Sequence, residues 1–181
     1  LTTAGGWGVV TADAVTAHPG LTLTNLPADL LAAIDGMLPP RWSRNNPVDL
    51  AAGETRDTIP DLLELVAGHP GTDSILQLGL GIQGNIAALT RRGPFYPDHG
   101  LERIVDFHER QERRYAEAAS EASARHSKPV LVASELAVAQ PENPMVTAVR
   151  ESGRLCYPSA DRAVAALGHL VRYAAWLKAR T

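Results

Sequence analysis

Three glycines near the start of the chain have the spacing of an anion-binding loop. The stretch TTAGGWGVVTADAV runs from Thr2 to Val15, and Gly5, Gly6 and Gly8 precede a run of Val and Ala that predicts a helix. A glycine-rich turn before a helix lets backbone N–H groups point at an anion, and the helix dipole adds about half a positive charge there. Phosphate is the anion that this pattern favours.

The spacing of these glycines excludes two common nucleotide motifs. GGxG is not the GxGxxG of dinucleotide-binding domains, and no Lys-Ser or Lys-Thr pair follows, as it would in an NTPase loop. A tight strand-to-helix turn would need the same glycines without binding any ligand. From the local sequence alone, both interpretations remain open.

Other site chemistries lack their characteristic residues. The six histidines form no HxxxH or HExxH pair, which argues against a metal site. No GxSxG motif surrounds Ser134 or Ser159, and Cys156 is the only cysteine, so neither a hydrolase triad nor a disulfide is indicated. We therefore predict no catalytic residue and no metal ligand in this chain.

The composition favours one domain over residues 1–181. The chain has 181 residues, of which 45% are hydrophobic, enough for a sizeable core. Its formal net charge of -3 gives no basic field, so neither nucleic acid nor an anionic membrane is an expected partner. No apolar run approaches the roughly 20 residues of a membrane span, and we predict a cytoplasmic protein. Because residue 1 is Leu and lies beside a loop, we expect a fragment excised from a larger protein.

Apolar runs alternate with helical patterns along the chain. Ser74–Leu78 and Pro129–Ala133 have the apolar character of strands buried on both faces of a parallel sheet, Leu155–Tyr157 predicts a third strand, and Leu21–Thr24 alternates like a fourth. Helices are predicted over Val9–Thr16, Pro27–Met37, Thr58–Val66, Leu101–His126 and Pro144–Glu151, and after a cap at Ser159 or Asp161.

This alternation predicts the α/β class. In the long helix over Leu101–His126, an apolar stripe is predicted from Ile104, Val105, Phe107, Tyr115 and Ala118. Ligands of parallel sheets gather outside the carboxyl ends of the strands, so the glycine loops at 5–8 and 79–84 are expected on one edge.

Five segments, in this order, carry a resemblance to a known family. They are TTAGGWGVVTADAV, NNPVDL at 45–50, LQLGLGIQGN at 76–85, KPVLVASEL at 128–136 and LCYPSADRAVAALGHLVRYAAWL at 155–177. The chain resembles the second flavodoxin-like CoA-ligase domain of NDP-forming acyl-CoA synthetases, such as ADP-forming acetyl-CoA synthetase, which is related to the carboxyl-terminal domain of the succinyl-CoA synthetase beta subunit. The resemblance implies a flavodoxin-like three-layer α/β/α domain. Its mostly parallel sheet would have about five strands, the first largely truncated at the amino terminus.

The resemblance also implies a function. The family converts a carboxylic acid, CoA and a nucleoside triphosphate to acyl-CoA, nucleoside diphosphate and phosphate, through an acyl phosphate and a phosphorylated histidine. Two helix amino termini hold that phosphohistidine, and this chain would supply one of them. The residues implied to form its phosphate cradle are Thr3, Ala4, Gly5, Gly6, Trp7 and Gly8. Trp7 stands where the family often has Pro, and we expect it to narrow the cradle.

Two further loops would support the site. The resemblance places the Asn-Pro-Val-Asp loop beside the cradle, with Asn46 or Asp49 bonding neighbouring backbone. It places Gly81, Gln83 and Asn85 near the acyl site of related enzymes, where the two amide side chains could donate hydrogen bonds.

The remaining chemistry of the family belongs to other domains. The resemblance implies as partners a CoA-binding domain, a phosphohistidine-bearing domain and an ATP-grasp domain, and a homo-oligomer is also compatible with it. This domain would bind no cofactor itself and would be inactive alone, whereas the whole enzyme would use CoA, ATP or GTP, and Mg. Two alternatives stay open. One is a non-catalytic regulatory or ligand-sensing domain, for example in a fused protein acetyltransferase, and the other is a flavin-binding flavodoxin.

Overall fold

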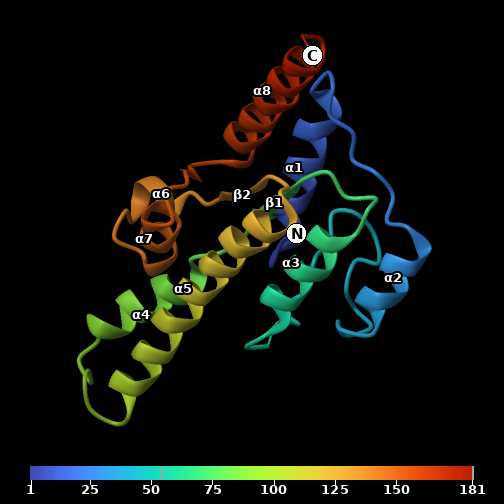
Figure 1. Ribbon diagram of the computed structural model, residues 1–181. Coiled ribbons are helices and arrows are strands. Elements are labelled where there is room, and N and C mark those ends of the chain that lie inside the picture. The colour runs from blue at the N-terminus through green and yellow to red at the C-terminus, as the bar shows by residue number, and fades with distance from the viewer. Residues whose placement is uncertain (54, 181) are drawn as a thin grey trace.

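Three parallel strands form the centre of the sheet. The computed structural model describes residues 1–53 and 55–180. Strands β1 (Ile75–Leu78), β2 (Val130–Ala133) and β3 (Cys156–Tyr157) lie side by side in that order. Figure 1 labels β1 and β2 near the centre of the molecule. Both pairings are parallel, with Ile75 opposite Val130 and Val132 opposite Cys156. The predicted α/β class with a parallel sheet is confirmed.

The predicted count of about five strands is wrong for the described residues, which form three. Thr2 makes isolated parallel bridges to Asp49 on one side and to Leu78 on the other. The spatial order is therefore Asp49, Thr2, β1, β2, β3, the flavodoxin-like order in which the first two positions are reduced to single bridges. The predicted strand at Leu21–Thr24 is also wrong, because the segment joins no ladder within the described residues.

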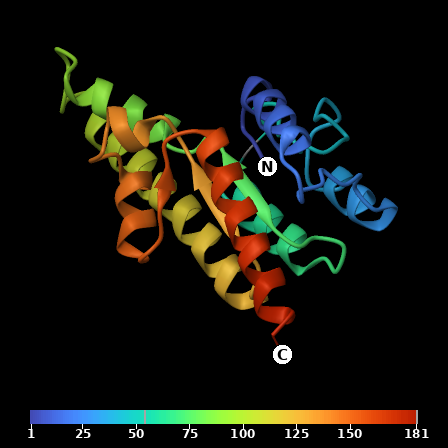
Figure 2. The same ribbon diagram turned by 90° about the horizontal axis from the view of Figure 1, so that it is seen from above.

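Helices cover both faces of this sheet (Figure 2). Their bounds are α1 Gly5–Ala17, α2 Ala28–Asp35, α3 Thr58–Gly68, α4 Ile82–Arg91, α5 Leu101–His126, α6 Leu136–Ala139, α7 Pro144–Glu151 and α8 Ala160–Lys178. The sequence predicted α5 and α7 with these same bounds and located α1, α2, α3 and α8 to within a few residues. Helices α4 and α6 were not predicted. No helix in the described part of the chain is both long and apolar enough to cross a membrane.

The side chains of β2 alternate between two cores. Val130 and Val132 belong to the larger core, which also contains buried residues of α3 and α5. Leu131 and Ala133 belong to a smaller core with Ala163 and Leu167 of α8. Since successive strand residues point to opposite faces, this alternation defines a three-layer α/β/α arrangement.

The buried stripe of α5 differs in part from the predicted one. Val105 and Tyr115 are buried as predicted, but residues Ile104 and Phe107 are 45% and 48% exposed. The face that packs against the neighbouring helices instead carries small and polar residues, namely Gln111, Glu112, Ala116, Ala119, Ala122 and Ser123. Helical spacing is compatible with either face of α5 being buried. The neighbouring helices lie close to α5, so the face with small side chains is the one that packs against them.

A buried carboxylate caps the start of α4. Glu112 of α5 is only 2% exposed and accepts hydrogen bonds from the backbone N–H of Gly81 at 2.7 Å and of Gln83 at 2.8 Å. Asn143 donates to the carbonyl of Gly81 at 3.0 Å, and Ser134 donates to the carbonyl of Leu80 at 3.1 Å. The loop after β1 is therefore fixed by side chains that lie far away in the sequence.

Replacing Glu112 should loosen this loop. Glu112→Ala leaves the buried N–H of Gly81 and the partly buried N–H of Gln83 without their acceptor, and the loss of a buried partner costs about 1–3 kcal/mol. We expect chemical denaturation to show a correspondingly lower free energy of unfolding. Glu112→Gln, the matched control, keeps one acceptor oxygen and should lose roughly half as much. Equal stability of the Ala variant and the unaltered chain would contradict this role of Glu112.

In a chain that starts at Leu1 with an unmodified amino group, this group makes the free energy of unfolding depend on pH. Burial lowers the pKa of this ammonium group from its ordinary value of 8.0 to about 5. Between these values the unfolded chain binds the proton and the folded chain does not, so stability falls as the pH falls from 8 towards 5. The slope is at most about 1.4 kcal/mol per pH unit. The free energy of unfolding, measured by denaturation at several pH values, should show this slope in the chain with a free amino group and not in the N-acetylated chain. Identical pH profiles of the two chains would contradict the burial of the charge.

Candidate functional site

Helix α1 begins at the carboxyl edge of the sheet. Ala4, the residue before the helix, has an extended backbone with φ of -146°. The hydroxyl of Thr2 accepts a hydrogen bond from the N–H of Ala4 at 3.1 Å and donates one to the carbonyl of Ala4 at 2.8 Å. Because Thr2 is fully buried between the Asp49 segment and β1, the start of the helix is anchored in the sheet.

The first turn of α1 has no side-chain cap within the described residues. The N–H groups of Gly5, Gly6 and Trp7 belong to the set that a helix cannot satisfy internally. Gly5 and Gly6 are exposed, and no acidic side chain stands in the first turn. These amides and the helix dipole therefore present an electropositive end to solvent.

The Asn-Pro-Val-Asp loop lies against this helix start, as the resemblance implied. A Cβ atom on Gly5 would lie 2.8 Å from the Asp49 carboxylate, and one on Gly8 would lie 3.3 Å from Pro47 and from Thr2. A side chain at either position would force its neighbour to shift, so glycine lets the loop and the helix start lie this close. The other oxygen of Asp49 accepts a hydrogen bond from the N–H of Ala51 at 3.0 Å, which fixes the carboxylate.

Asn46 of the same loop serves a different neighbour. Its side-chain amide donates a hydrogen bond to the carbonyl of Thr24 at 2.9 Å. Asn46 and Asp49 thus both bond backbone, but only Asp49 lies at the glycines. Asp49 therefore contributes a negative charge beside the amides, and Asn46 holds the connection between α1 and α2.

The loop after β1 also reaches the cradle. The hydroxyl of Thr3 donates a hydrogen bond to the carbonyl of Gly79 at 2.9 Å, which joins the two glycine loops on one edge, as predicted. The ring of Trp7 lies against the same glycine, 3.1 Å from the point where a Cβ would be. Trp7 is partly buried and packs against the smaller core, so much of its ring covers the end of the sheet.

Gly81, Gln83 and Asn85 make other contacts. The N–H groups of Gly81 and Gln83 donate to Glu112, and the side-chain oxygen of Gln83 lies 3.2 Å from a ring nitrogen of His108. The side-chain oxygen of Asn85 accepts a hydrogen bond from Gln140. These groups hold α4 to its neighbours, and their assignment to an acyl site remains a prediction.

The sequence analysis did not predict the side chains that hold the loop after β1 in place. Glu112 lies at helical spacing from the buried Val105, Tyr115 and Ala119, which is the signal that could have placed it on the buried face of α5. Asn143 precedes Pro144 and caps α7 by accepting from the N–H of Met145 at 3.0 Å, an Asn-Pro pattern typical of a helix start. No local pattern indicates that Ser134 bonds Leu80.

Among the described residues, no three His, Cys, Asp or Glu side chains gather in a way that could hold a metal ion. The arrangement at α1 instead offers three backbone donors, a helix dipole and one fixed carboxylate. Such a site can bind a phosphoryl group.

Comparisons with known proteins support the resemblance. Residues 1–84 match the model of the Ligase-CoA domain family. This segment contains the cradle, the Asn46–Asp49 loop and β1 with the glycines that follow it. A comparison with curated proteins gave no match.

Two solved structures share the fold. The structure of PH0766 from Pyrococcus horikoshii OT3 superposes with a TM-score of 0.67 at 22% identity, and the match covers 94% of this chain and 34% of that one. The apo form of the dinucleotide forming acetyl-coenzyme A synthetase 1 from Ca. Korarchaeum cryptofilum superposes with a TM-score of 0.65 at 21% identity. That match covers 96% of this chain and 32% of the synthetase chain. The chain spans about a third of the length of either protein. The Ligase-CoA match over residues 1–84 supports the predicted resemblance to a CoA-ligase domain, and the two solved structures confirm the predicted fold.

Proposed function

We propose that this chain is a domain of an NDP-forming acyl-CoA synthetase, and that the start of α1 binds the phosphoryl group of a phosphohistidine carried by another domain. The observation that carries the proposal is the uncapped, exposed first turn, with the N–H groups of Gly5, Gly6 and Trp7 at the carboxyl edge of the sheet. The Ligase-CoA match over residues 1–84 supports the family assignment.

The proposed role requires binding without proton transfer. A phosphohistidine that moves between two reaction centres must be held at each centre and then released. Backbone N–H groups and a helix dipole stabilise its negative charge, and they neither titrate nor react. The domain therefore acts as a fixed electrostatic cradle.

Asp49 limits how tightly the cradle holds its ligand. Its carboxylate lies against Gly5 and is held there by the N–H of Ala51. A phosphoryl group at the amides would approach this charge, and the repulsion favours release. We propose that Asp49 keeps the phosphorylated form from being trapped.

The proposal assigns the remaining chemistry to other domains. The nucleotide, CoA and Mg would bind to an ATP-grasp domain and a CoA-binding domain, and the histidine would belong to a further flavodoxin-like domain. This domain would bind no cofactor and would be inactive alone. That division accords with a chain that spans about a third of the length of the two matched proteins.

A charge placed at Gly6 tests the function in the whole synthetase. A Cβ at Gly6 meets no atom within 4 Å, and an acidic residue in a first helical turn is favourable, so Gly6→Glu should fold normally. The added charge repels the phosphoryl group, and we expect phosphorylation of the histidine to slow by at least about tenfold. CoA affinity should not change.

Gly6→Gln is the matched control for this experiment, because it has the same length without the charge. It should slow phosphoryl transfer much less than Gly6→Glu. Rapid-quench measurement of the phosphorylated histidine gives the rate, and equilibrium binding gives the CoA affinity. A rate for Gly6→Glu equal to that of the unaltered enzyme would contradict the proposed role of α1.

Removing the charge of Asp49 should have the opposite effect on binding. Asp49→Asn keeps an oxygen that can accept from Ala51 but abolishes the repulsion, so the isolated domain should bind inorganic phosphate several-fold more tightly. Titration at constant ionic strength measures this, with Asp13→Asn on α1 as the control. Equal affinities for the Asp49→Asn and Asp13→Asn variants would show that Asp49 does not face the ligand.

A further inference from the structure

A cavity of about 410 Å³ opens at the amino edge of the sheet, opposite the edge where α1 begins. Its lining includes the residues that lead into β2 and β3 and one residue of α8, namely Lys128, Pro129, Arg154, Leu155 and Leu170. The volume lies within the range of roughly 300–1,000 Å³ that small-molecule sites occupy. The cavity therefore has room for a small organic ligand.

Two cationic side chains of this cavity have hydrogen-bond donors to spare. The Nζ of Lys128 donates to the carbonyl of His69 at 2.7 Å. The guanidinium of Arg154 donates to the hydroxyl of Ser123 at 2.8 Å and to the carbonyl of Ser120 at 3.4 Å. Both cations carry more N–H groups than these bonds use. Within the described residues neither forms an ion pair with a carboxylate, so no described side chain neutralises the positive charge at this cavity.

Ser123 of α5 holds both cationic residues in place. Its buried hydroxyl accepts the hydrogen bond from Arg154 and donates one to the carbonyl of Lys128 at 2.7 Å. The N–H of Lys128 donates in turn to the carbonyl of Ser123 at 3.3 Å. A guanidinium that is already positioned loses less conformational entropy when it binds a planar anion. The charge at this cavity is therefore preorganised.

Apolar side chains lie exposed beside these cations. Leu155 is 70% exposed and Leu170 is 46% exposed, and both line the cavity. Pro129 and Tyr157 add further apolar surface to the lining. A ligand with a hydrocarbon part would remove the two leucines from water, which is favourable. The cavity therefore combines an anion-binding end with an apolar wall.

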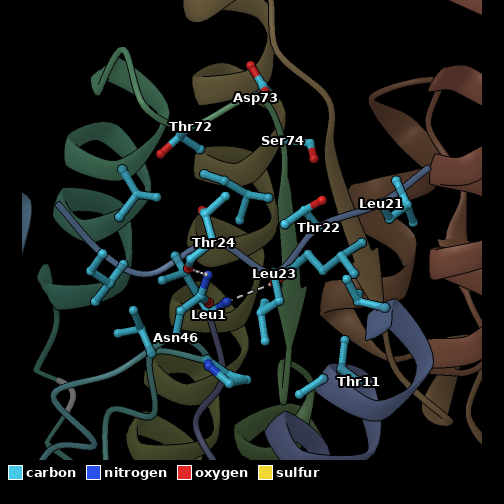
Figure 3. Close-up of a pocket in the computed structure, with 18 of the residues that line it drawn as sticks. Leu1, Thr11, Leu21, Thr22, Leu23, Thr24, Asn46, Thr72, Asp73 and Ser74 are labelled. Atoms are coloured by element: carbon cyan, nitrogen blue, oxygen red, sulfur yellow. Dashed lines mark hydrogen bonds between the residues drawn. The ribbon is translucent and has the colours of Figure 1, made fainter. Parts of the chain in front are cut away.

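Helix α8 also borders a second cavity, which lies beside Leu1 (Figure 3). Val171 lines that cavity, whereas Leu170, the preceding residue, lines the one at the amino edge. Among the described residues, the lining beside Leu1 includes Asp73 and no lysine or arginine. Of these two cavities, the one at the amino edge is therefore the one that favours an anion.

We propose that the cavity at the amino edge binds a small amphipathic carboxylate. Its carboxylate would accept hydrogen bonds from Lys128 and Arg154, and its hydrocarbon part would pack against Leu155 and Leu170. The fork of a guanidinium matches the plane of a carboxylate, and the ammonium adds a second positive charge. An inorganic anion would leave the leucines exposed, and an uncharged hydrocarbon would leave the cations without a counterion. The carboxylate site is independent of the function proposed for α1.

Octanoate is the probe that tests this site, with acetate and 1-octanol as matched ligands. Acetate has the charge without the hydrocarbon chain, and 1-octanol has the chain without the charge. We titrate the chain at constant ionic strength and follow the backbone amide shifts by NMR. Octanoate should bind at least about tenfold more tightly than either control, because only octanoate uses both parts of the cavity. The largest shifts should occur at Lys128, Arg154 and Leu155.

Two variants of α8 test the position of the ligand. Leu170 and Leu177 are 46% and 45% exposed, and of these two only Leu170 lines the cavity. Leu170→Glu places a negative charge in the apolar wall, and we expect it to weaken octanoate binding by at least about tenfold. Leu177→Glu makes the same change at an equally exposed position of the same helix, and it should keep the affinity of the unaltered chain.

A second pair of variants tests the cation. Lys128→Gln removes one charge of the cavity and should weaken octanoate binding several-fold. Arg125→Gln is the matched control, because Arg125 pairs with Glu64 at 2.9 Å and does not line the cavity. Its affinity should stay unchanged.

Four results would overturn the proposal. Equal affinities for octanoate and 1-octanol would show that the cations take no part, and equal affinities of the Leu170→Glu and Leu177→Glu variants would show that the ligand lies elsewhere. Shifts centred on α1 or on the cavity beside Leu1 would assign octanoate to another place. An absence of shifts at Lys128, Arg154 and Leu155 would show that the cavity does not bind it.

Discussion

The hydrogen bonds around Thr2 hold together the edge on which the candidate site depends. Its N–H donates to the carbonyl of Val48 at 2.9 Å, and its carbonyl accepts from the N–H of Leu50 at 3.0 Å. On the other side the residue is bridged to Leu78 of β1, and its hydroxyl bonds Ala4. One buried residue therefore joins the cradle, the Asp49 loop and the sheet, and it determines where α1 begins.

Helices α1 and α4 both begin at this edge, and they differ in what accepts hydrogen bonds from the N–H groups of their first turns. At α4, the carboxylate of Glu112 accepts hydrogen bonds from the N–H groups of Gly81 and Gln83. Because Glu112 is buried, an anion from solvent cannot easily replace it. At α1, Gly5 and Gly6 are exposed, and no side chain caps the first turn within the described residues. Water can satisfy these N–H groups when no ligand is present, so an anion can come and go. This contrast favours α1 over α4 as the place where a mobile phosphoryl group would bind.

Local signals predicted much of this structure. The apolar runs predicted at Ser74–Leu78 and Pro129–Ala133 contain β1 and β2, and the glycine loops at the edge of the sheet meet through Thr3 and Gly79. Helix α4 was missed because Gly84 and Asn85 lower its helix propensity, while its start is capped by a glutamate 31 residues from Gly81. The exposed Ile104 and Phe107 were misplaced for a similar reason, since neighbouring helices select the buried face of α5. Contacts distant in sequence thus account for the errors.

The measurement that tests the central claim most directly is a map of backbone amide shifts by NMR, with the domain titrated with a phosphorylated imidazole as a probe for phosphohistidine. The account predicts that the largest shifts occur at Gly5, Gly6 and Trp7, while the amides of Gly81 and Gln83 keep their shifts because Glu112 occupies them. Shifts centred on Gly81 and Gln83, or none at the start of α1 at saturating probe, would contradict it.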